Sequence, residues 1–278
     1  MNNKLIFLDI DGTLTEPGSN VPPDSALQAI QEARQNGHKV FLCSGRNPNM
    51  LKPVLAYDFD GFVSVNGGYV QVGDEVIYDH PMRREQFEQA IQLLHDQGVF
   101  CTVEGRDGAF GDEGIGDFMA KASGGNSELK RWRRAIEESL GIRPMKEYDG
   151  QPVYKIIFMC GDMEQIAPAK AALEQDFDFV IQGNSDGIIN GEMVNRAFDK
   201  GRAIIRVCEY LGKEISDTVG FGDSMNDLEM IQTVGTSVCM DNGAEALKKI
   251  STIVCPSVSE DGLAQAFREL GLSNKKDS

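Results

Sequence analysis

The feature that most constrains the fold is a short apolar run that occurs near both ends of the chain and is closed each time by acidic residues. Leu5 to Leu8 is followed by Asp-Ile-Asp-Gly-Thr at positions 9–13, and the run at 217–222 is followed by Asp-Ser-Met-Asn-Asp at positions 223–227. Short apolar runs bounded by turn residues are typical of strands buried on both faces, as in a parallel sheet. The chain is therefore predicted to be α/β.

Helical segments alternate with these strands. Apolar residues recur at helical spacing after Pro22-Pro23-Asp24, and Asn36-Gly37 is a common signal for the end of a helix. Further strands are predicted at 39–43, 61–65, 236–239 and 252–255, and further helices at 225–231, 244–250 and 262–270. This order predicts a doubly wound, Rossmann-like parallel sheet to which both ends of the chain contribute.

The middle of the chain has a different pattern. Residues 70–78 and 155–159 alternate between apolar and polar side chains, which favours strands with one solvated face. Helices are predicted near 85–97 and 163–175. A smaller α+β domain is therefore expected as an insertion into the parallel core.

The boundaries follow from this change of pattern. The core is predicted at residues 1–81 and 196–278, and the inserted domain at residues 82–195. Residues 105–125 are rich in Gly and Asp, which predicts a mobile surface loop, with a substrate lid as the alternative.

The formal net charge of −16 limits the kinds of partner. Its field repels nucleic acids and anionic membranes, so neither is expected to bind. A phosphorylated metabolite would be repelled as well, unless a divalent cation, a lysine and backbone N–H groups reverse the sign locally. The apolar runs are too short for a membrane span or a signal peptide, and the six cysteines are scattered without a Cys-x-x-Cys pair. Buried free thiols in a cytoplasmic protein are expected.

Asp9 and Asp11 are the predicted catalytic pair. Ligands of an open parallel sheet bind beyond the carboxyl ends of its strands, and residues two apart in extended chain point to the same side. Asp9 would attack phosphorus, and Asp11 would protonate the leaving alcohol and later deprotonate water, which requires a pKa above its usual value. Gly12 would let the backbone approach the phosphate. A solvated turn or a calcium-like loop is the alternative interpretation.

The acidic cluster at positions 223–227 is predicted to lie at the same edge of the sheet. Its carboxylates would repel the first pair unless a cation were present, and Mg²⁺ fits because it binds few carboxylates and bridges to phosphate oxygens. The predicted ligands are Asp9, Asp223 and the main-chain carbonyl of Asp11. Asp227 either supports the metal or orients a lysine. Capping of the following helix by Asp223 or Ser224 is the alternative.

Two further motifs carry groups that bind anions. Ser44-Gly45-Arg46 ends a predicted strand and supplies a hydroxyl and free N–H groups, although an ordinary helix cap would look the same. Arg46 could reach either the substrate or a surface acid. Lys200 begins a predicted helix, where a positive charge opposes the helix dipole and needs a negative partner. The partner is either a phosphate with the aspartates, or Asp199 in a surface salt bridge.

These four motifs, in this order, resemble those of the haloacid dehalogenase-like hydrolase superfamily, and more closely its Cof-type phosphatases, over most of the chain. The resemblance implies a nucleophile and an acid/base at Asp9 and Asp11, and a cap domain that returns to the core near Glu192-Met193-Val194. Asn66 would border the active site, although a plain turn into a hairpin explains it as well. The residues implied to bind phosphate or substrate are Gly12, Ser44, Gly45, Arg46, Asn66, Lys200 and Asn226, and those implied to bind metal are Asp9, Asp11, Asp223 and Asp227.

The expected function is Mg²⁺-dependent hydrolysis of a small phosphorylated metabolite, such as a sugar phosphate, through an aspartyl phosphate. The presence of Asp11 favours phosphoryl transfer over the dehalogenase branch of the family. A sugar phosphomutase and a non-catalytic protein that binds phosphorylated metabolites are the alternatives. The motifs carry no signature of a particular substrate or oligomeric state.

Overall fold

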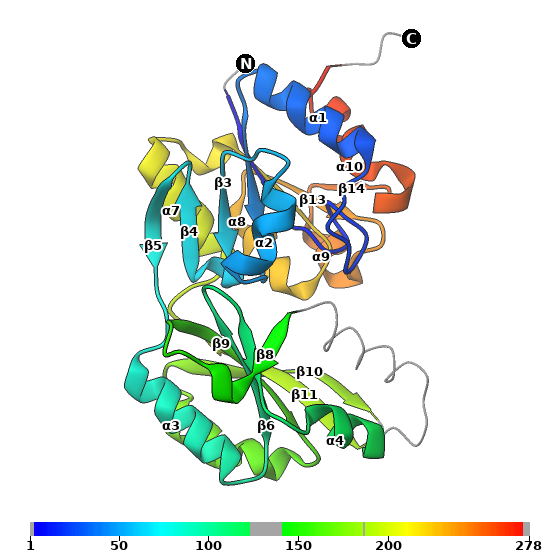
Figure 1. Ribbon diagram of the computed structural model, residues 1–278. Coiled ribbons are helices and arrows are strands. Elements are labelled where there is room, and N and C mark those ends of the chain that lie inside the picture. The colour runs from blue at the N-terminus through cyan, green and yellow to red at the C-terminus, as the bar shows by residue number, and fades with distance from the viewer. Residues whose placement is uncertain (1–2, 123–140, 186, 275–278) are drawn as a thin grey trace. The chain divides into compact units, whose positions relative to one another are not determined.

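The computed structural model describes residues 3–122, 141–185 and 187–274 (Figure 1). The chain divides into two compact units. The core unit comprises residues 1–46, 51–79 and 198–278, and the inserted unit comprises residues 47–50 and 80–197. Each unit is described by itself below. No helix in the described part of the chain has both the length and the apolar character needed to cross a membrane.

The core unit is built on one eight-stranded sheet with the order β14-β13-β12-β1-β2-β3-β4-β5. The six strands from β14 to β3 are parallel, and β4 and β5 continue the sheet antiparallel. The central strands are buried along their whole length, as their apolar sequences predict. The bounds are β1 Leu5–Leu8, β2 Lys39–Cys43, β3 Gly61–Ser64, β4 Tyr69–Val72, β5 Glu75–Asp79, β12 Thr218–Gly222, β13 Thr236–Met240 and β14 Ile253–Cys255.

Helices pack against this sheet. Helix α7 contacts β3, β4 and β5, and α8 contacts β12 and β13, whereas α1 and α10 lie side by side and contact β2, β13 and β14 (Figure 1). The bounds are α1 Asp24–Gln35, α2 Pro48–Leu55, α7 Lys200–Leu211, α8 Leu228–Thr233, α9 Glu245–Ile250 and α10 Gly262–Glu269. The predicted doubly wound α/β core is confirmed.

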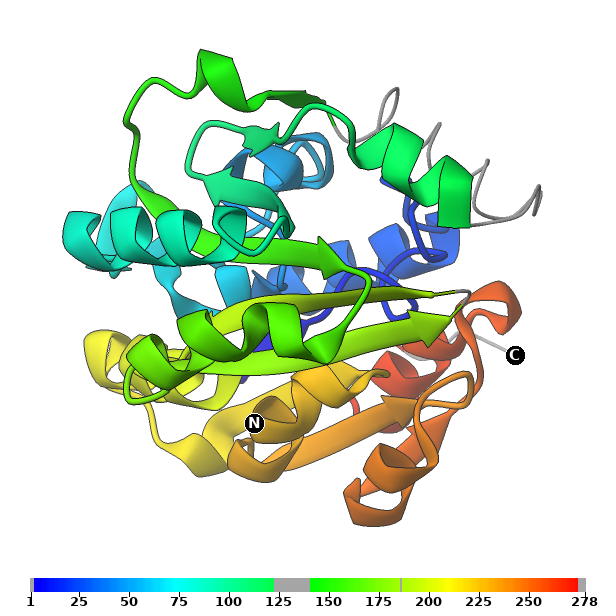
Figure 2. The same ribbon diagram turned by 90° about the horizontal axis from the view of Figure 1, so that it is seen from below.

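The inserted unit has a six-stranded sheet with the order β10-β11-β9-β6-β7-β8. Helices α3 and α6 contact each other and lie against this sheet, in front of it in the view from below (Figure 2). Cys101, Val103 and Phe158 are among the residues of the apolar core of this unit. The bounds are α3 Arg84–His95, β6 Phe100–Gly105, β7 Ala109–Gly111, α4 Ile115–Ala122, β8 Ile142–Pro144, β9 Val153–Cys160, α6 Ala167–Leu173, β10 Phe177–Ser185 and β11 Ile188–Asn195.

The structure corrects two expectations about the middle of the chain. The alternating segment at 70–78 belongs to the core sheet as the β4–β5 hairpin, because strands at the edge of a sheet also have one solvated face. Residues 105–122, predicted as loop, contain β7 and α4. The high glycine content led to the prediction of a loop, but a short strand with the fully buried Phe110 lies between Gly108 and Gly111. The rest of that predicted loop, 123–125, lies outside the described residues.

Candidate functional site

The predicted site residues of the core unit gather at one edge of its sheet. Asp9 directly follows β1, Ser44 follows β2, and Asp223 follows β12. These three strands are neighbours and run parallel, so their carboxyl ends meet at the same edge. Stretches of chain more than 200 residues apart are thereby brought together, since the Thr13 hydroxyl donates to Asp223 Oδ1 at 2.9 Å.

Lys200 lies at the centre of this group. Its side chain is fully buried, and its Nζ donates to Asp9 Oδ1 at 2.7 Å and to Asp227 Oδ1 at 2.5 Å. Asp199 instead accepts a hydrogen bond from the backbone N–H of Arg202 and pairs with its side chain. The alternative of a surface salt bridge between Lys200 and Asp199 is therefore wrong, and the negative partners of Lys200 are the buried aspartates.

Three carboxylates surround this one lysine. Oxygens of Asp9, Asp223 and Asp227 all lie within 4.8 Å of one another. Burial, followed by the charge of Asp227, raises the pKa of Asp9 well above its usual value. Burial also raises the pKa of Asp223 to about 6, although the hydrogen bond from Thr13 opposes this. One positive charge does not balance three carboxylates, so the cluster has the donor set and the charge to bind a divalent cation.

Asp227 uses both of its oxygens. Oδ1 accepts from Lys200, and Oδ2 accepts from the backbone N–H groups of Asp223 at 3.0 Å and Ser224 at 3.1 Å. The bond from Ser224 N–H is one half of a capping box at the start of a short 3₁₀ turn over Met225–Asp227, so the capping alternative describes part of this loop. The geometry supports orientation of Lys200 as the role of Asp227.

Gly12 is held in a conformation that only glycine adopts readily. Its φ is +84°, and a Cβ at this position would lie 2.5 Å from Asp223 Oδ2. Asn242, which follows β13 at the same edge, donates from Nδ2 to the Gly12 carbonyl at 2.8 Å. Thr13 and Asn242 were not predicted as site residues. Thr13 lies within the first motif, and the position of Asn242 after a predicted parallel strand was the signal for the second.

Asp11 is bound by Arg46 through two hydrogen bonds. Arg46 Nε donates to Asp11 Oδ2 at 2.8 Å and Nη2 donates to Oδ1 at 2.6 Å, while the Gly18 N–H donates to Oδ1 at 2.9 Å. Burial alone would raise the pKa of Asp11, but these hydrogen bonds and the positive charge of Arg46 lower it. The predicted rise is therefore contradicted, because an arginine rather than a carboxylate is the dominant neighbour. Arg46 reaches an acid of the site itself.

Asn66 and Asn226 flank Gly45 in the second motif. A Cβ on Gly45 would lie 3.0 Å from Asn66 Oδ1 and 3.6 Å from Asn226 Nδ2. Val65 and Asn66 both have positive φ, +50° and +54°, which is strained for a β-branched residue. The Asn66 Oδ1 atom is buried and has no hydrogen-bond partner among the described residues. The turn leads into β4 and also holds Asn66 beside Gly45.

Ser44 is buried at the end of β2. Its Oγ accepts from the backbone N–H of Arg46 at 3.2 Å, so it makes the local hydrogen bond that a cap would make. The strand end and this bond fix the hydroxyl within the same motif as Gly45 and Arg46. All the predicted site residues thus lie in the loops at the carboxyl ends of the core strands or at the start of α7.

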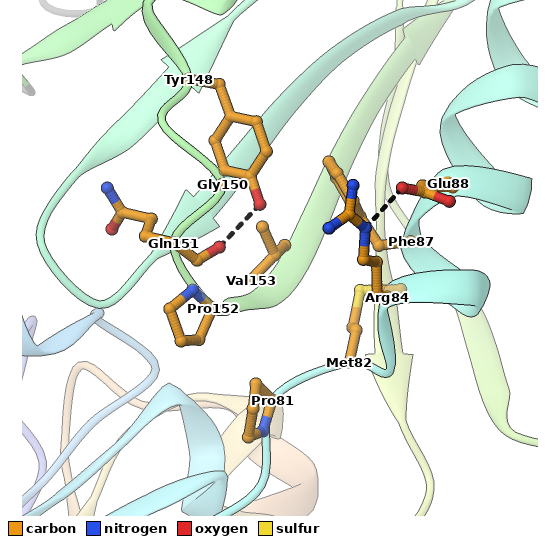
Figure 3. A pocket seen from close by; sticks show the side chains of 10 residues that line it. All are labelled: Pro81, Met82, Arg84, Phe87, Glu88, Tyr148, Gly150, Gln151, Pro152 and Val153. Carbon is orange, nitrogen blue, oxygen red and sulfur yellow. Dashed lines mark hydrogen bonds and ion pairs between the residues drawn. The ribbon is translucent and has the colours of Figure 1, made fainter.

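The inserted unit has a pocket of its own of about 270 Å³ (Figure 3). Its charged groups pair with each other, since Arg84 Nε donates to Glu88 Oε1 at 2.7 Å. The Tyr148 hydroxyl donates to the Gln151 carbonyl at 2.6 Å. The pocket is lined by Pro81, Met82, Arg84, Phe87, Glu88, Tyr148, Gly150, Gln151, Pro152 and Val153. None of the predicted site residues lines it.

The six cysteines match their predicted state. All are free and buried, and burial raises the pKa of the thiol of Cys43, which lies close enough to Lys200 for the two charges to interact. A thiol with a raised pKa is a poor nucleophile at neutral pH. Cys43 therefore acts as an apolar side chain behind the site.

Comparison with known proteins gives a consistent family. A family profile of haloacid dehalogenase-like hydrolases matches residues 6–267. YkrA of Bacillus subtilis (strain 168), provisionally named as a phosphatase, is 32% identical over 98% of this chain and 99% of its own length. The 5-amino-6-(5-phospho-D-ribitylamino)uracil phosphatase YwtE of the same organism is 27% identical over 96% and 98%. The solved structure of the HAD subclass IIB sugar phosphatase BT4131 matches with a TM-score of 0.74 and 22% identity over 97% of this chain and 100% of that chain, which shows a shared fold.

Proposed function

Because this chain belongs to the haloacid dehalogenase-like hydrolase family and is a hydrolase of the phosphatase class, we propose that it is a Mg²⁺-dependent phosphomonoesterase with Asp9 as covalent nucleophile. The observation that carries this proposal is the position of Lys200. It is fully buried between Asp9 and Asp227, with Asp223 completing an acidic cluster that one lysine cannot neutralise. A divalent cation would supply the positive charge that this arrangement lacks, and would allow an anionic phosphoryl group to bind beside the carboxylates.

Asp9 is suited to nucleophilic attack on phosphorus. Lys200 binds its Oδ1 and leaves the second oxygen to form the new bond to phosphorus. As that bond forms, the ester P–O bond breaks and the leaving alcohol takes a proton from Asp11. Water then attacks the aspartyl phosphate and gives a proton to Asp11, which releases phosphate and restores the Asp9 carboxylate.

The acid/base role of Asp11 depends on its contact with Arg46. With Arg46 bound, Asp11 is ionised at neutral pH and cannot donate a proton. A phosphate dianion nearby would oppose the effect of Arg46 and raise the pKa of Asp11. We therefore place protonation of Asp11 after substrate binding. Arg46 would hold the carboxylate in position between the two proton transfers.

The acidic cluster fits a magnesium ion. Asp9, Asp223 and the main-chain carbonyl of Asp11 would hold it, and a bound Mg²⁺ would offset the negative charge of the phosphate oxygens. The raised pKa values of Asp9 and Asp223 support this assignment, because burial and the charge of Asp227 disfavour their ionised forms and a cation would favour them. Gly12, Ser44, Gly45, Asn66 and Asn226 are the proposed phosphate or substrate contacts.

The proposed substrate is a small phosphorylated metabolite, with sugar phosphates as the first class to test. Two of the proteins compared above are named for such substrates, a phosphorylated ribitylaminouracil and a sugar phosphate. The net charge of −16 argues against nucleic acid and anionic membranes as partners. Six buried free cysteines suit a reducing compartment, so we place the protein in the cytoplasm.

Phosphate release from an aryl phosphate tests this proposal. We expect Mg²⁺-dependent turnover in the wild-type protein and a loss of at least about 10³-fold in kcat for Asp9→Asn. Asp74→Asn, at an exposed position, is the matched control and should keep full activity. An acid-quenched acyl phosphate that hydroxylamine cleaves should appear only when Asp9 is present. Near wild-type turnover in Asp9→Asn would reject the covalent mechanism. With a sugar phosphate as substrate, formation of an isomerised sugar phosphate without free phosphate would identify a phosphomutase.

A further inference from the structure

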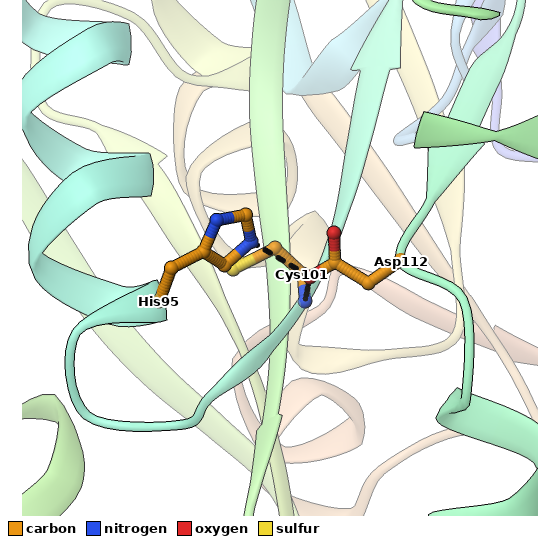
Figure 4. Close-up of side chains that lie close together, drawn as sticks. All are labelled: His95, Cys101 and Asp112. Carbon is orange, nitrogen blue, oxygen red and sulfur yellow. Dashed lines mark hydrogen bonds and ion pairs between the residues drawn. The ribbon is translucent and has the colours of Figure 1, made fainter. Parts of the chain in front are cut away.

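The inserted unit brings together three side chains with metal-binding atoms. His95 comes from the last turn of α3, Cys101 from β6, and Asp112 from the residue after β7. His95 and Asp112 project toward each other beside Cys101 (Figure 4). One ligand atom from each side chain lies within 4.8 Å of the other two. All three residues belong to the inserted unit and have no part in the function proposed above.

Hydrogen bonds fix the carboxylate within this cluster. Asp112 Oδ2 accepts from the backbone N–H of Cys101 at 2.7 Å and lies 2.8 Å from His95 Nε2. Among the described residues, the Cys101 thiol makes a weak contact, 3.9 Å from sulfur to the Val99 carbonyl. The Cys101 sulfur can therefore exchange this contact for a metal ion, while the backbone N–H of Cys101 holds the Asp112 carboxylate in place.

Exposure differs across the cluster. Cys101 is completely buried, whereas the side chain of His95 is 37% exposed and that of Asp112 is 16% exposed. An ion could enter from the His95 side and meet the sulfur at the closed end. Solvent at the open side would supply a water ligand.

We propose that His95, Cys101 and Asp112 bind a zinc-like divalent cation at a site separate from the magnesium cluster. One imidazole, one thiolate and one carboxylate, completed by water, form a typical three-ligand zinc site. The thiolate and the carboxylate together balance a charge of +2. A thiolate ligand selects zinc, cobalt and similar ions over Mg²⁺ and Ca²⁺, which prefer oxygen ligands only.

The proton balance of binding is simple. Burial raises the pKa of the Cys101 thiol, so the metal-free side chain carries a proton, which the ion displaces to solvent. In the metal-free site His95 Nε2 carries the proton that the Asp112 carboxylate accepts. When the ion binds, the neutral imidazole changes tautomer, so that its proton moves to Nδ1 and the Nε2 lone pair binds the metal. The Cys101 N–H remains bonded to Asp112 and orients the ligating carboxylate. Binding therefore releases one proton and ties the ends of α3, β6 and β7 together.

Cobalt titration of the full-length chain tests the site. Excess Mg²⁺ is added first, so that the aspartate cluster of the core unit is occupied. We expect Co²⁺ to produce thiolate-to-cobalt charge-transfer absorption that saturates at one equivalent, and Zn²⁺ to displace it. Zn²⁺ should also raise the Tm under the same Mg²⁺ concentration. Absence of the charge-transfer absorption in wild-type protein would overturn the proposal.

Variants separate ligation from simple packing. Cys101→Ala should lose the charge-transfer absorption, whereas Cys160→Ala should keep it, because Cys160 is an equally buried free thiol in β9 of the same sheet. Asp112→Asn keeps an oxygen for the Cys101 N–H but loses the charge, and should weaken Co²⁺ binding by at least about 10-fold. Unchanged Co²⁺ affinity in Asp112→Asn would also overturn the site, and this variant decides the question if Cys101→Ala does not fold.

Discussion

In the described part of each unit a lysine is buried between two carboxylates, and the two arrangements differ in a way that separates the proposed active site from a structural ion pair. In the core unit, Lys200 Nζ lies 2.7 Å from Asp9 and 2.5 Å from Asp227. In the inserted unit, Lys155 Nζ lies 3.2 Å from Glu192 and 3.5 Å from Glu104. The contacts of Lys200 are shorter, and its side chain is completely buried.

The backbone around the two lysines explains the difference. Lys155 lies within β9, and its partners lie on the neighbouring strands β6 and β11, so pairing of the strands positions all three side chains. Lys200 begins a helix, and its partners come from loops that follow strands. Loops can place a third carboxylate, Asp223, beside the same lysine, which leaves an excess of negative charge. The comparison teaches that position at the strand ends, and not burial of a lysine, distinguishes the proposed active site.

Replacement of Lys200 should have the largest effect. Lys200→Met removes the positive charge that orients Asp9 and would offset the negative charge of the bound phosphate. This substitution should lower kcat by at least about 10³-fold. Lys155→Met is the matched substitution in the inserted unit. If a folded Lys155→Met protein lost as much activity in a phosphate-release assay, the distinction between the two lysines would fail.

Lys155→Met should instead reduce stability. It leaves two buried glutamates without a positive partner, which should lower the free energy of unfolding by about 3 kcal/mol. Replacement of all three residues, with Glu104→Gln and Glu192→Gln added, should recover most of that loss. Urea unfolding measures both changes. A triple variant no more stable than Lys155→Met would show that this arrangement depends on its charges.

Arg46 gives an intermediate case, because it pairs with one carboxylate of the site and not with two. Arg46→Lys cannot bind Asp11 through two parallel hydrogen bonds, so proton transfer should suffer. We expect kcat to fall by about 10- to 100-fold for alkyl phosphates and by less for aryl phosphates, whose leaving groups need no proton. An equal loss for both substrate classes would identify Arg46 as a phosphate contact rather than a positioning residue for Asp11.

The burial of Asp223 beside Asp227 should also appear as a pH effect, the smallest of the four. Asp223 has its pKa raised to about 6 in the folded state, so the folded protein holds this proton more tightly than the unfolded chain does. Its contribution to stability is present below about pH 4 and is lost as the pH rises through 6, which amounts to about 1–2 kcal/mol for a partly open group.

Added Mg²⁺ should remove this loss, because the ion replaces the proton. Thermal unfolding at pH 5 and pH 7, in EDTA and in Mg²⁺, measures the effect. A metal-free protein that is equally stable at both pH values would show that ionisation of Asp223 does not destabilise the folded state.

The aspartate motifs were predictable because their information is local. A buried strand followed by acidic residues places Asp9 and Asp223 at one sheet edge in any parallel α/β fold. The contact between Asp11 and Arg46 was not predictable in the same way, because it depends on the direction in which two loops turn. The roles of these residues stay predictions until activity is measured.

The groups in the inserted unit left no local signal. Glu104, Lys155 and Glu192 meet because three antiparallel strands share one register, and register is set by pairing between distant segments. Cys101 and Asp112 meet because β6 pairs with β7, and His95 joins them from the end of α3, which precedes β6 in the chain. From the sequence alone, the scattered cysteines are predicted to be buried thiols and the acidic residues to be solvated. Their proximity becomes evident only when the pairing of the strands is known.

The order of the strands in the core sheet has a consequence for how the protein is made. Strand β1 pairs with β2 on one side and with β12 on the other, although β12 is synthesised about 200 residues later. A nascent chain on the ribosome therefore carries an unpaired edge of β1, exposed to other chains, until the inserted unit has emerged. Lys200 and Asp223 arrive only after the inserted unit, so hydrolysis should begin only after both have been synthesised.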